Sequence, residues 1–295
     1  MFIAASIAEV CSFSSPKCQE AKTVSKLTSA IPTAGGVYHW ASITPGPRYG
    51  RALGFFAGFI NYFGWIFDLA SIISIPANIV VQMYAIFHPD LVIEPWHVYV
   101  AYVLITWICC FIVIFGNRLL PAINHFGLFM IIAGGIITII VCAAMGTHAE
   151  RSFVWASFDE NNLTGWPSGI AFMTGVLNGA FTIGTPDAVT KMSEELPNPK
   201  RDMPKAVLLQ VALGTLTSFV YAIAILYSIT DLNAVVTSNG SFPMAAIYAQ
   251  ATGSAAGTFG LLMILFLSIM VCTIDTYLTV RLNPLLFLTA PPPPL

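Results

Sequence analysis

The sequence predicts an all-α integral membrane protein, a bundle of several membrane-spanning helices. Of its 295 residues, 57% are hydrophobic and only 9% are charged, whereas soluble domains carry about 25% charged residues. The mean hydropathy is +0.79, and several apolar runs approach the roughly 20 residues that a helix needs to cross a bilayer. Because 12 basic residues face 14 acidic ones and form no basic stripe, nucleic acid is not an expected partner.

The apolar runs give the predicted spans in chain order. They are Leu53–Phe87, Val98–Phe115, Ala122–Met145, Ser168–Ile183, Ala206–Ile229 and Ala255–Val280. A weaker span involves the N-terminus, where Met1–Cys11 is too short to cross alone. Glu9 and the lack of basic residues there argue against a signal peptide.

Basic residues gather on alternate connections between these spans. Seven Lys and Arg residues lie in the connections Pro45–Arg51, Gly116–Asn124 and Lys191–Lys205. The other connections contain Arg151 alone, so the positive-inside rule predicts that the basic set faces the cytoplasm. Two N-x-[ST] sequons, at Asn162 and Asn239, fall on the opposite side, where we expect glycosylation.

The six cysteines show no CxxC pair or Cys/His spacing of a metal or redox site. Four of them lie in apolar runs, where a thiol behaves as a small hydrophobe: Cys109, Cys110, Cys142 and Cys272. The sequence also contains no HExxH, GxSxG or histidine cluster. We therefore expect no metal site, no cofactor and no enzymatic activity.

Three segments together resemble the amino acid–polyamine–organocation (APC) superfamily, especially its fungal choline, GABA and amino-acid permeases. Pro32–Trp40, PTAGGVYHW, resembles the PT(S/A)GGxYHW signature that ends the second helix of that family. Gly175–Glu195, GVLNGAFTIGTPDAVTKMSEE, resembles its interrupted sixth helix, and Leu196–Ala206, LPNPKRDMPKA, the loop entering helix seven. The resemblance implies one transporter domain over residues 1–280, similar to helices two to eight of a LeuT-like transporter.

Two stretches interrupt the resemblance. Residues Ser12–Thr28 stand inside the helix-two segment, and they are either a non-family insert, such as a retained intron, or a genuine loop in a re-entrant hairpin. Residues 281–295, RLNPLLFLTAPPPPL, stand where the family continues into a basic loop and four more helices. We interpret them as an aberrant Pro-rich tail, so the chain resembles a permease truncated at both ends.

The interrupted helix is the first predicted substrate site. A break lets backbone groups face a cavity at mid-membrane, and Gly184 and Pro186 favour one here, although a simple proline kink is the alternative. The predicted substrate-binding residues of this segment are Asn178, Gly179, Phe181, Thr182, Ile183, Gly184 and Thr185. By resemblance Phe181 is the gating aromatic; core packing is the alternative. Asp187 either caps the second half-helix, which would favour a cationic or zwitterionic solute and allow ion coupling, or has no part in substrate binding.

Asp68 lies inside an apolar run, where a carboxylate costs at least about 2.5–3.5 kcal/mol on insertion scales. It follows Asn61, Tyr62 and Trp65 at helical spacing, so we predict that Trp65 and Asp68 bind a cationic group through charge and cation–π attraction. Asp68 is also a candidate for proton coupling, and a structural hydrogen-bond anchor is the alternative. Asp275, the other acid in an apolar run, lies near the inner end of the last span.

A charged network at the cytoplasmic face can close the inner gate in transporters of this kind. The predicted members are Arg48, Arg51, Glu194 and Glu195, with a solvated loop as the alternative. The overall prediction is secondary transport of choline, GABA or an amino acid by alternating access, with a choline-like solute favoured. We expect proton coupling and the plasma membrane, with the solute and the lipid bilayer as partners. The alternatives are a non-functional permease fragment and a seven-helix receptor, against which the PTAGGVYHW signature argues.

Overall fold

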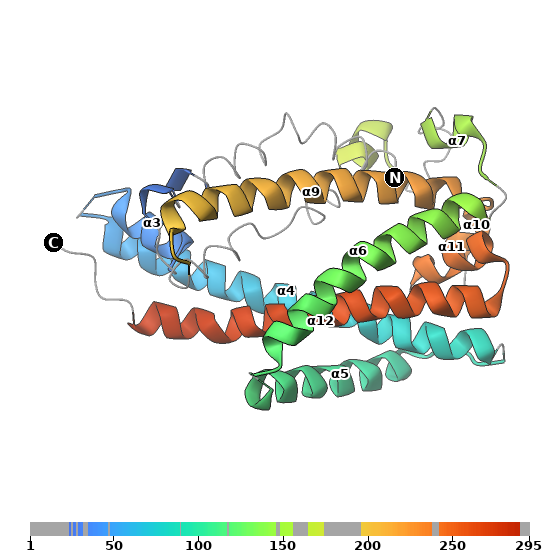
Figure 1. Cartoon of the computed structure of the whole chain (residues 1–295), viewed down its shortest axis with the longest axis horizontal. Coiled ribbons are helices and arrows are strands. Elements are labelled where there is room, and N and C mark those ends of the chain that lie inside the picture. Colours follow the sequence, from blue (N-terminus) through green and yellow to red (C-terminus); the bar gives the residue numbers. More distant parts are fainter. Residues whose placement is uncertain are drawn as a thin grey trace. The chain divides into compact units, whose positions relative to one another are not determined.

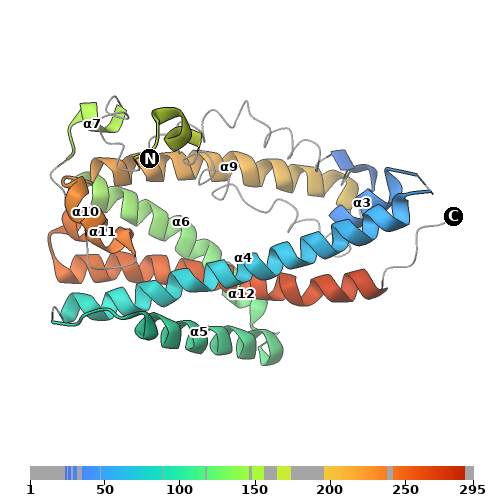
Figure 2. The same ribbon diagram turned by 180° about the vertical axis from the view of Figure 1, so that it is seen from behind.

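The computed structural model describes residues 24, 26–27, 29–31, 35–46, 48–88, 90–116, 118–145, 148–155, 165–173, 196–237 and 242–289. Every regular element within these ranges is a helix. Five of the helices found there are long and apolar enough to cross a membrane. They are α4 (Gly50–Phe87), α5 (Pro95–Phe115), α6 (Leu120–Ala144), α9 (Pro199–Tyr227) and α12 (Ala255–Thr289) (Figure 1 and, from behind, Figure 2). The chain is therefore an all-α, multi-span membrane protein, as the apolar runs predict.

Five of the predicted spans coincide with these helices, and four of them, α4, α5, α6 and α9, begin earlier than predicted. In the last three, proline explains the difference, because it favours the first turn of a helix, where its missing N–H is not needed. Pro95 opens α5, Pro121 is the second residue of α6 and Pro199 opens α9. Of the predicted span Ser168–Ile183, residues 168–173 are helical and the rest lies outside the described residues.

Helix α4 is the longest described span. Its 38 residues correspond to about 57 Å at 1.5 Å per residue. Pro76 lies inside the helix without ending it and is buried. Near the last turn of α4, the Phe87 ring meets Phe259 of α12 edge-on, with ring centroids 5.5 Å apart.

The chain divides into two compact units. The first contains residues 1–64, 155–222 and 281–295, and the second contains residues 65–154 and 223–280. In the first unit, α3 (Val37–Ile43) follows the two glycines of the PTAGGVYHW segment. Trp40 in α3 is buried, and its indole N–H donates to the Ile31 carbonyl at 3.0 Å. The last residue of the signature thus ties α3 to the preceding segment at Ile31.

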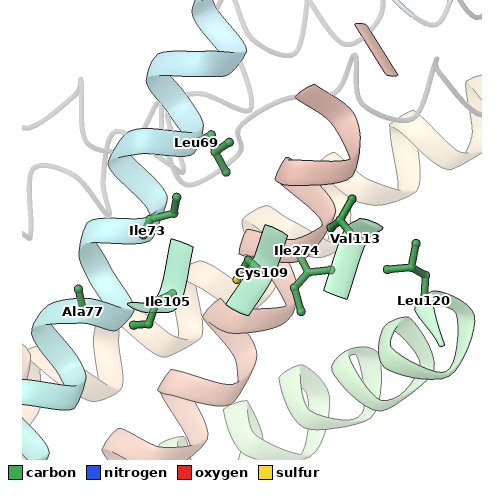
Figure 3. Packing of buried hydrophobic residues seen from close by; sticks show 8 residues of the cluster. All are labelled: Leu69, Ile73, Ala77, Ile105, Cys109, Val113, Leu120 and Ile274. Atoms are coloured by element: carbon green, nitrogen blue, oxygen red, sulfur yellow. The ribbon is translucent and has the colours of Figure 1, made fainter. Parts of the chain in front are cut away.

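The core of the second unit joins four helices (Figure 3). Helix α4 and α5 each supply residues at four-residue spacing, which places them on one helical face. The cluster comprises Leu69, Ile73 and Ala77 of α4, Ile105, Cys109 and Val113 of α5, Leu120 of α6 and Ile274 of α12. Cys109 and Cys142 are buried, as expected of cysteines that act as small hydrophobes, whereas Cys272 is exposed.

Two short helices lie between α9 and α12, within a stretch that the sequence suggests only as a connection. They are α10 (Leu232–Thr237) and α11 (Pro243–Thr252), and α7 (Arg151–Trp155) follows α6. The Gln250 side chain on α11 accepts hydrogen bonds from the backbone N–H groups of Thr230 and Asp231 at 3.1 and 3.3 Å. It also donates to the Asp231 carbonyl at 3.0 Å. Gln250 thereby fixes the start of α10 against α11.

Candidate functional site

Trp65 and Asp68 lie three residues apart on α4, so they share one side of the helix. Trp65 is only 6% exposed, and Asp68 and Tyr62 are half-buried. The helical backbone expected for this segment is therefore present, and it places Trp65 and Asp68 about one turn apart on the same side. Such a surface has the chemistry to hold an organic cation, because a negative charge and aromatic faces both attract it.

A second carboxylate in an apolar helix has a partner on a neighbouring span. With the Asn124 amide of α6 oriented so that its nitrogen faces the carboxylate, it donates to Asp275 of α12, at 2.9 Å to Oδ1 and 3.3 Å to Oδ2. Asp275 is half-buried. This pair joins two helices that are separated by about 150 residues of sequence and satisfies a carboxylate that would be costly in lipid.

Cys272 lies near both carboxylates. It precedes Asp275 by three residues on α12, and Asp68 is close enough to act on its thiol electrostatically. We name Asp68, Asn124, Cys272 and Asp275 the carboxylate cluster. The described part of the chain contains no group of three or more His, Cys, Asp and Glu residues able to hold a metal ion. The chemistry that these side chains offer is proton binding and attraction of a cation.

The depth of the carboxylate cluster follows from the contact between Phe87 and Phe259. Asp68 precedes Phe87 by 19 residues, about 28 Å of helix, and Asp275 follows Phe259 by 16 residues, about 24 Å. Both acids therefore lie at a similar distance along their helices from the Phe87–Phe259 contact. The positive-inside prediction places them on the cytoplasmic side of that contact.

Arg48 and Arg51 lie where the chain enters α4, and both are exposed. The Arg48 guanidinium stands 5.6 Å from the centroid of the Tyr49 ring. Their predicted partners Glu194 and Glu195 lie outside the described residues, as do the sequons at Asn162 and Asn239. The same holds for Asp187 and for the predicted substrate-binding residues Asn178, Gly179, Phe181, Thr182, Ile183, Gly184 and Thr185.

Asn124 is the site residue that sequence reasoning missed. A signal was present, because an Asn inside an apolar run usually faces the interior of a bundle and finds a partner. Which helix supplies that partner depends on tertiary packing, and Asp275 lies 151 positions away. A single sequence contains no information about such a pairing.

The comparison with known families decides the identity. A family model described as "Amino acid permease" matches residues 23–280. The chain belongs to the amino acid permease family. This result confirms the resemblance to APC superfamily permeases. The match begins within Ser12–Thr28 and ends at Val280, just before the segment that we interpret as a tail.

Fungal permeases are among the relatives. The chain is 36% identical over 251 residues to the choline transporter of Saccharomyces cerevisiae, covering 83% of this chain and 44% of the yeast protein. It is 30% identical over 254 residues to a Macrophomina phaseolina protein named for amino acid and polyamine transport, covering 85% of this chain and 55% of that protein. With the 7-keto 8-aminopelargonic acid transporter of Saccharomyces cerevisiae it shares 34% identity over 206 residues, 67% of this chain and 36% of the relative. The permease chain thus spans about half the length of these relatives.

Proposed function

We propose that this permease chain transports a small nitrogenous solute by alternating access, and that the solute is choline or closely similar to it. The observation that carries the proposal is the 36% identity to a choline transporter over 83% of the chain. The half-buried Asp68 beside Trp65 on α4 supports it, because a carboxylate and an aromatic ring together attract a quaternary ammonium group.

Further roles belong to the same proposal. Asp68 and Asp187 are candidates for proton coupling, since an ionisable residue inside a membrane helix commonly carries protons in transporters. We propose an inner-gate network of Arg48 and Arg51 with Glu194 and Glu195. The proposed substrate contacts of the interrupted helix are Asn178, Gly179, Phe181, Thr182, Ile183, Gly184 and Thr185. The plasma membrane is the proposed location.

Uptake of labelled choline, GABA and amino acids into transporter-deficient cells tests the proposal. Choline uptake above that of untransformed cells is the expected result, and Asp68→Asn should lower it at least about tenfold, a loss of about 1.4 kcal/mol of solute interaction. Asp90→Asn is the matched control, because Asp90 is an exposed acid in the connection before α5.

The proposal fails if the chain reaches the membrane in normal amounts and takes up none of these solutes. Unchanged uptake by both Asp68→Asn and Phe181→Ala would contradict the proposed site while leaving transport intact. A version without Ser12–Thr28 tests the suspected insert, and we expect it to take up more choline than the unchanged chain does.

A further inference from the structure

The side chain of Gln210 on α9 contains a buried hydrogen-bond acceptor that has no donor in the described part of the chain. Its side-chain oxygen Oε1 is buried, and it accepts no hydrogen bond from the described part of the chain. A carbonyl oxygen taken out of water without a donor is costly. A bound ligand that supplies a donor would satisfy this oxygen and so explain why it lacks a partner within the protein.

The side of α9 that carries Gln210 changes character along the helix. Towards its start this side is apolar and closed, because Met203, Val207 and Val211 are buried. One turn beyond Gln210 stands Gly214, and outside its own helix no heavy atom of the described residues lies within 4 Å of where its Cβ would be. The described part of the chain therefore leaves room for a further group beside Gly214.

A small polar residue, Ser218, follows on the same side of α9. Ser218, one further turn along, is half-buried, and its hydroxyl donates to the Gly214 carbonyl at 2.6 Å. The hydroxyl hydrogen is thereby used inside the helix, while the oxygen of Ser218 retains acceptor capacity. Gln210 and Ser218 thus stand one turn before and one turn after Gly214, each with an acceptor oxygen.

The position of these groups along α9 suits a solute site. Gln210 follows Pro199 by 11 residues and precedes Tyr227 by 17, which corresponds to about 17 and 26 Å of helix. Gln210 and Gly214 thus lie in the central part of the span, and transporter substrate sites lie near the bilayer midplane.

We propose that Gln210 is a specificity-determining residue whose Oε1 accepts a hydrogen bond from a donor on the solute, namely the hydroxyl group of choline. The inference rests on the proposed function for its solute. It adds that the chain distinguishes choline from a quaternary ammonium of the same shape without a hydroxyl group. A site built to pair with a substrate hydroxyl disfavours the analogue that lacks it, because its buried polar group then stays unpaired.

The test is a pair of binding titrations on the purified full chain in detergent, with choline and with ethyltrimethylammonium. We expect the unchanged chain to bind choline roughly tenfold to a hundredfold more tightly. In Gln210→Leu that ratio should fall to about one, mainly through weaker choline binding. Gln210→Met, which keeps the length of the side chain, provides the same comparison if the leucine variant does not fold.

Gln82→Leu is the matched control, since Gln82 is a half-buried glutamine of another span, α4. It should leave the ratio unchanged. A ratio that persists in the Gln210 variants overturns the inference, and so does a lower melting temperature of those variants without any change of ratio, because Oε1 would then be paired within the chain. Absence of choline binding to the unchanged chain also overturns it.

Failure of this inference and failure of the proposed function give different results. Choline uptake with no selectivity over ethyltrimethylammonium leaves transport standing and removes the role of Gln210. Selective, Gln210-dependent binding without uptake leaves the role of Gln210 standing and removes transport by this chain.

Discussion

Gly134 of α6 lies so close to Ile264 of α12 that a Cβ at the glycine would collide with the isoleucine Cγ2. Seven residues earlier on α6, a Cβ at Gly127 would meet Val271, seven residues further along α12. The two helices therefore run antiparallel with two glycines at their closest approaches. Small residues allow this approach, and van der Waals packing drives helix association in lipid.

The first prediction uses this contact. Gly134→Ala should destabilise the chain by about 1–3 kcal/mol, because the added methyl group overpacks a tight interface. Its neighbour Gly135 provides the control, since no described atom lies within 4 Å of where its Cβ would be. Gly135→Ala should be neutral or should stabilise by up to about 1 kcal/mol through helix propensity. Melting temperatures in detergent measure both, and equal effects would contradict the packing argument.

A second prediction concerns Asn124 and Asp275. Asn124→Leu removes the donor from a half-buried carboxylate and should cost about 1–3 kcal/mol of unfolding free energy. Asp275→Leu should also destabilise, whereas the double variant should lose less than the two single losses added together, because neither polar group is left alone. A double-mutant cycle measures this coupling. Strict additivity would show that the hydrogen bond contributes nothing.

The third prediction concerns Gln250, which bonds to the backbone of Thr230 and Asp231. Gln250→Ala should raise the rate of amide hydrogen exchange at residues 230–235, because α10 loses its attachment to α11. Exchange in α5 should stay as it was, which serves as the internal control. Mass spectrometry of peptic peptides reports both regions. Unchanged exchange at the start of α10 would rule out the proposed attachment.

The fourth prediction tests the orientation of the spans. Asn162 and Asn239 should both carry glycans, because the positive-inside rule assigns their connections to the outer side. Removing glycans with an endoglycosidase should increase gel mobility of the chain expressed in a eukaryotic cell. Asn162→Gln and Asn239→Gln should each remove part of that shift, and their combination all of it. An unmodified chain would argue for the opposite orientation.

Much of the fold follows from the sequence because hydrophobic runs are local signals. The runs give α4, α5, α6, α9 and α12, and errors occur mainly at their starts. The prediction missed the first seven residues of α9 because its first turns contain Lys200, Arg201 and Asp202. These charges lower the hydropathy of the window, although an acid in the first turn favours a helix.

Other features are beyond the reach of a single sequence. Helices α10 and α11 contain 6 and 10 residues, too few for an amphipathic pattern to stand out from a loop. Helix α12 continues to Thr289, into the segment interpreted as a Pro-rich tail. At the candidate site, the helical spacing of Trp65 and Asp68 was predictable because it is local. The partner of Asp275 was not, because it depends on how distant helices pack.

The length of α4 has a consequence for how the protein sits in lipid. A helix of about 57 Å exceeds a hydrocarbon layer of about 30 Å by a factor of nearly two. Even a tilt of about 40°, near the upper end of what transmembrane helices adopt, leaves about 44 Å along the membrane normal. That distance equals the whole bilayer with its head groups. Helix α4 therefore extends beyond the hydrocarbon layer, and its terminal residues lie among the lipid head groups or in water.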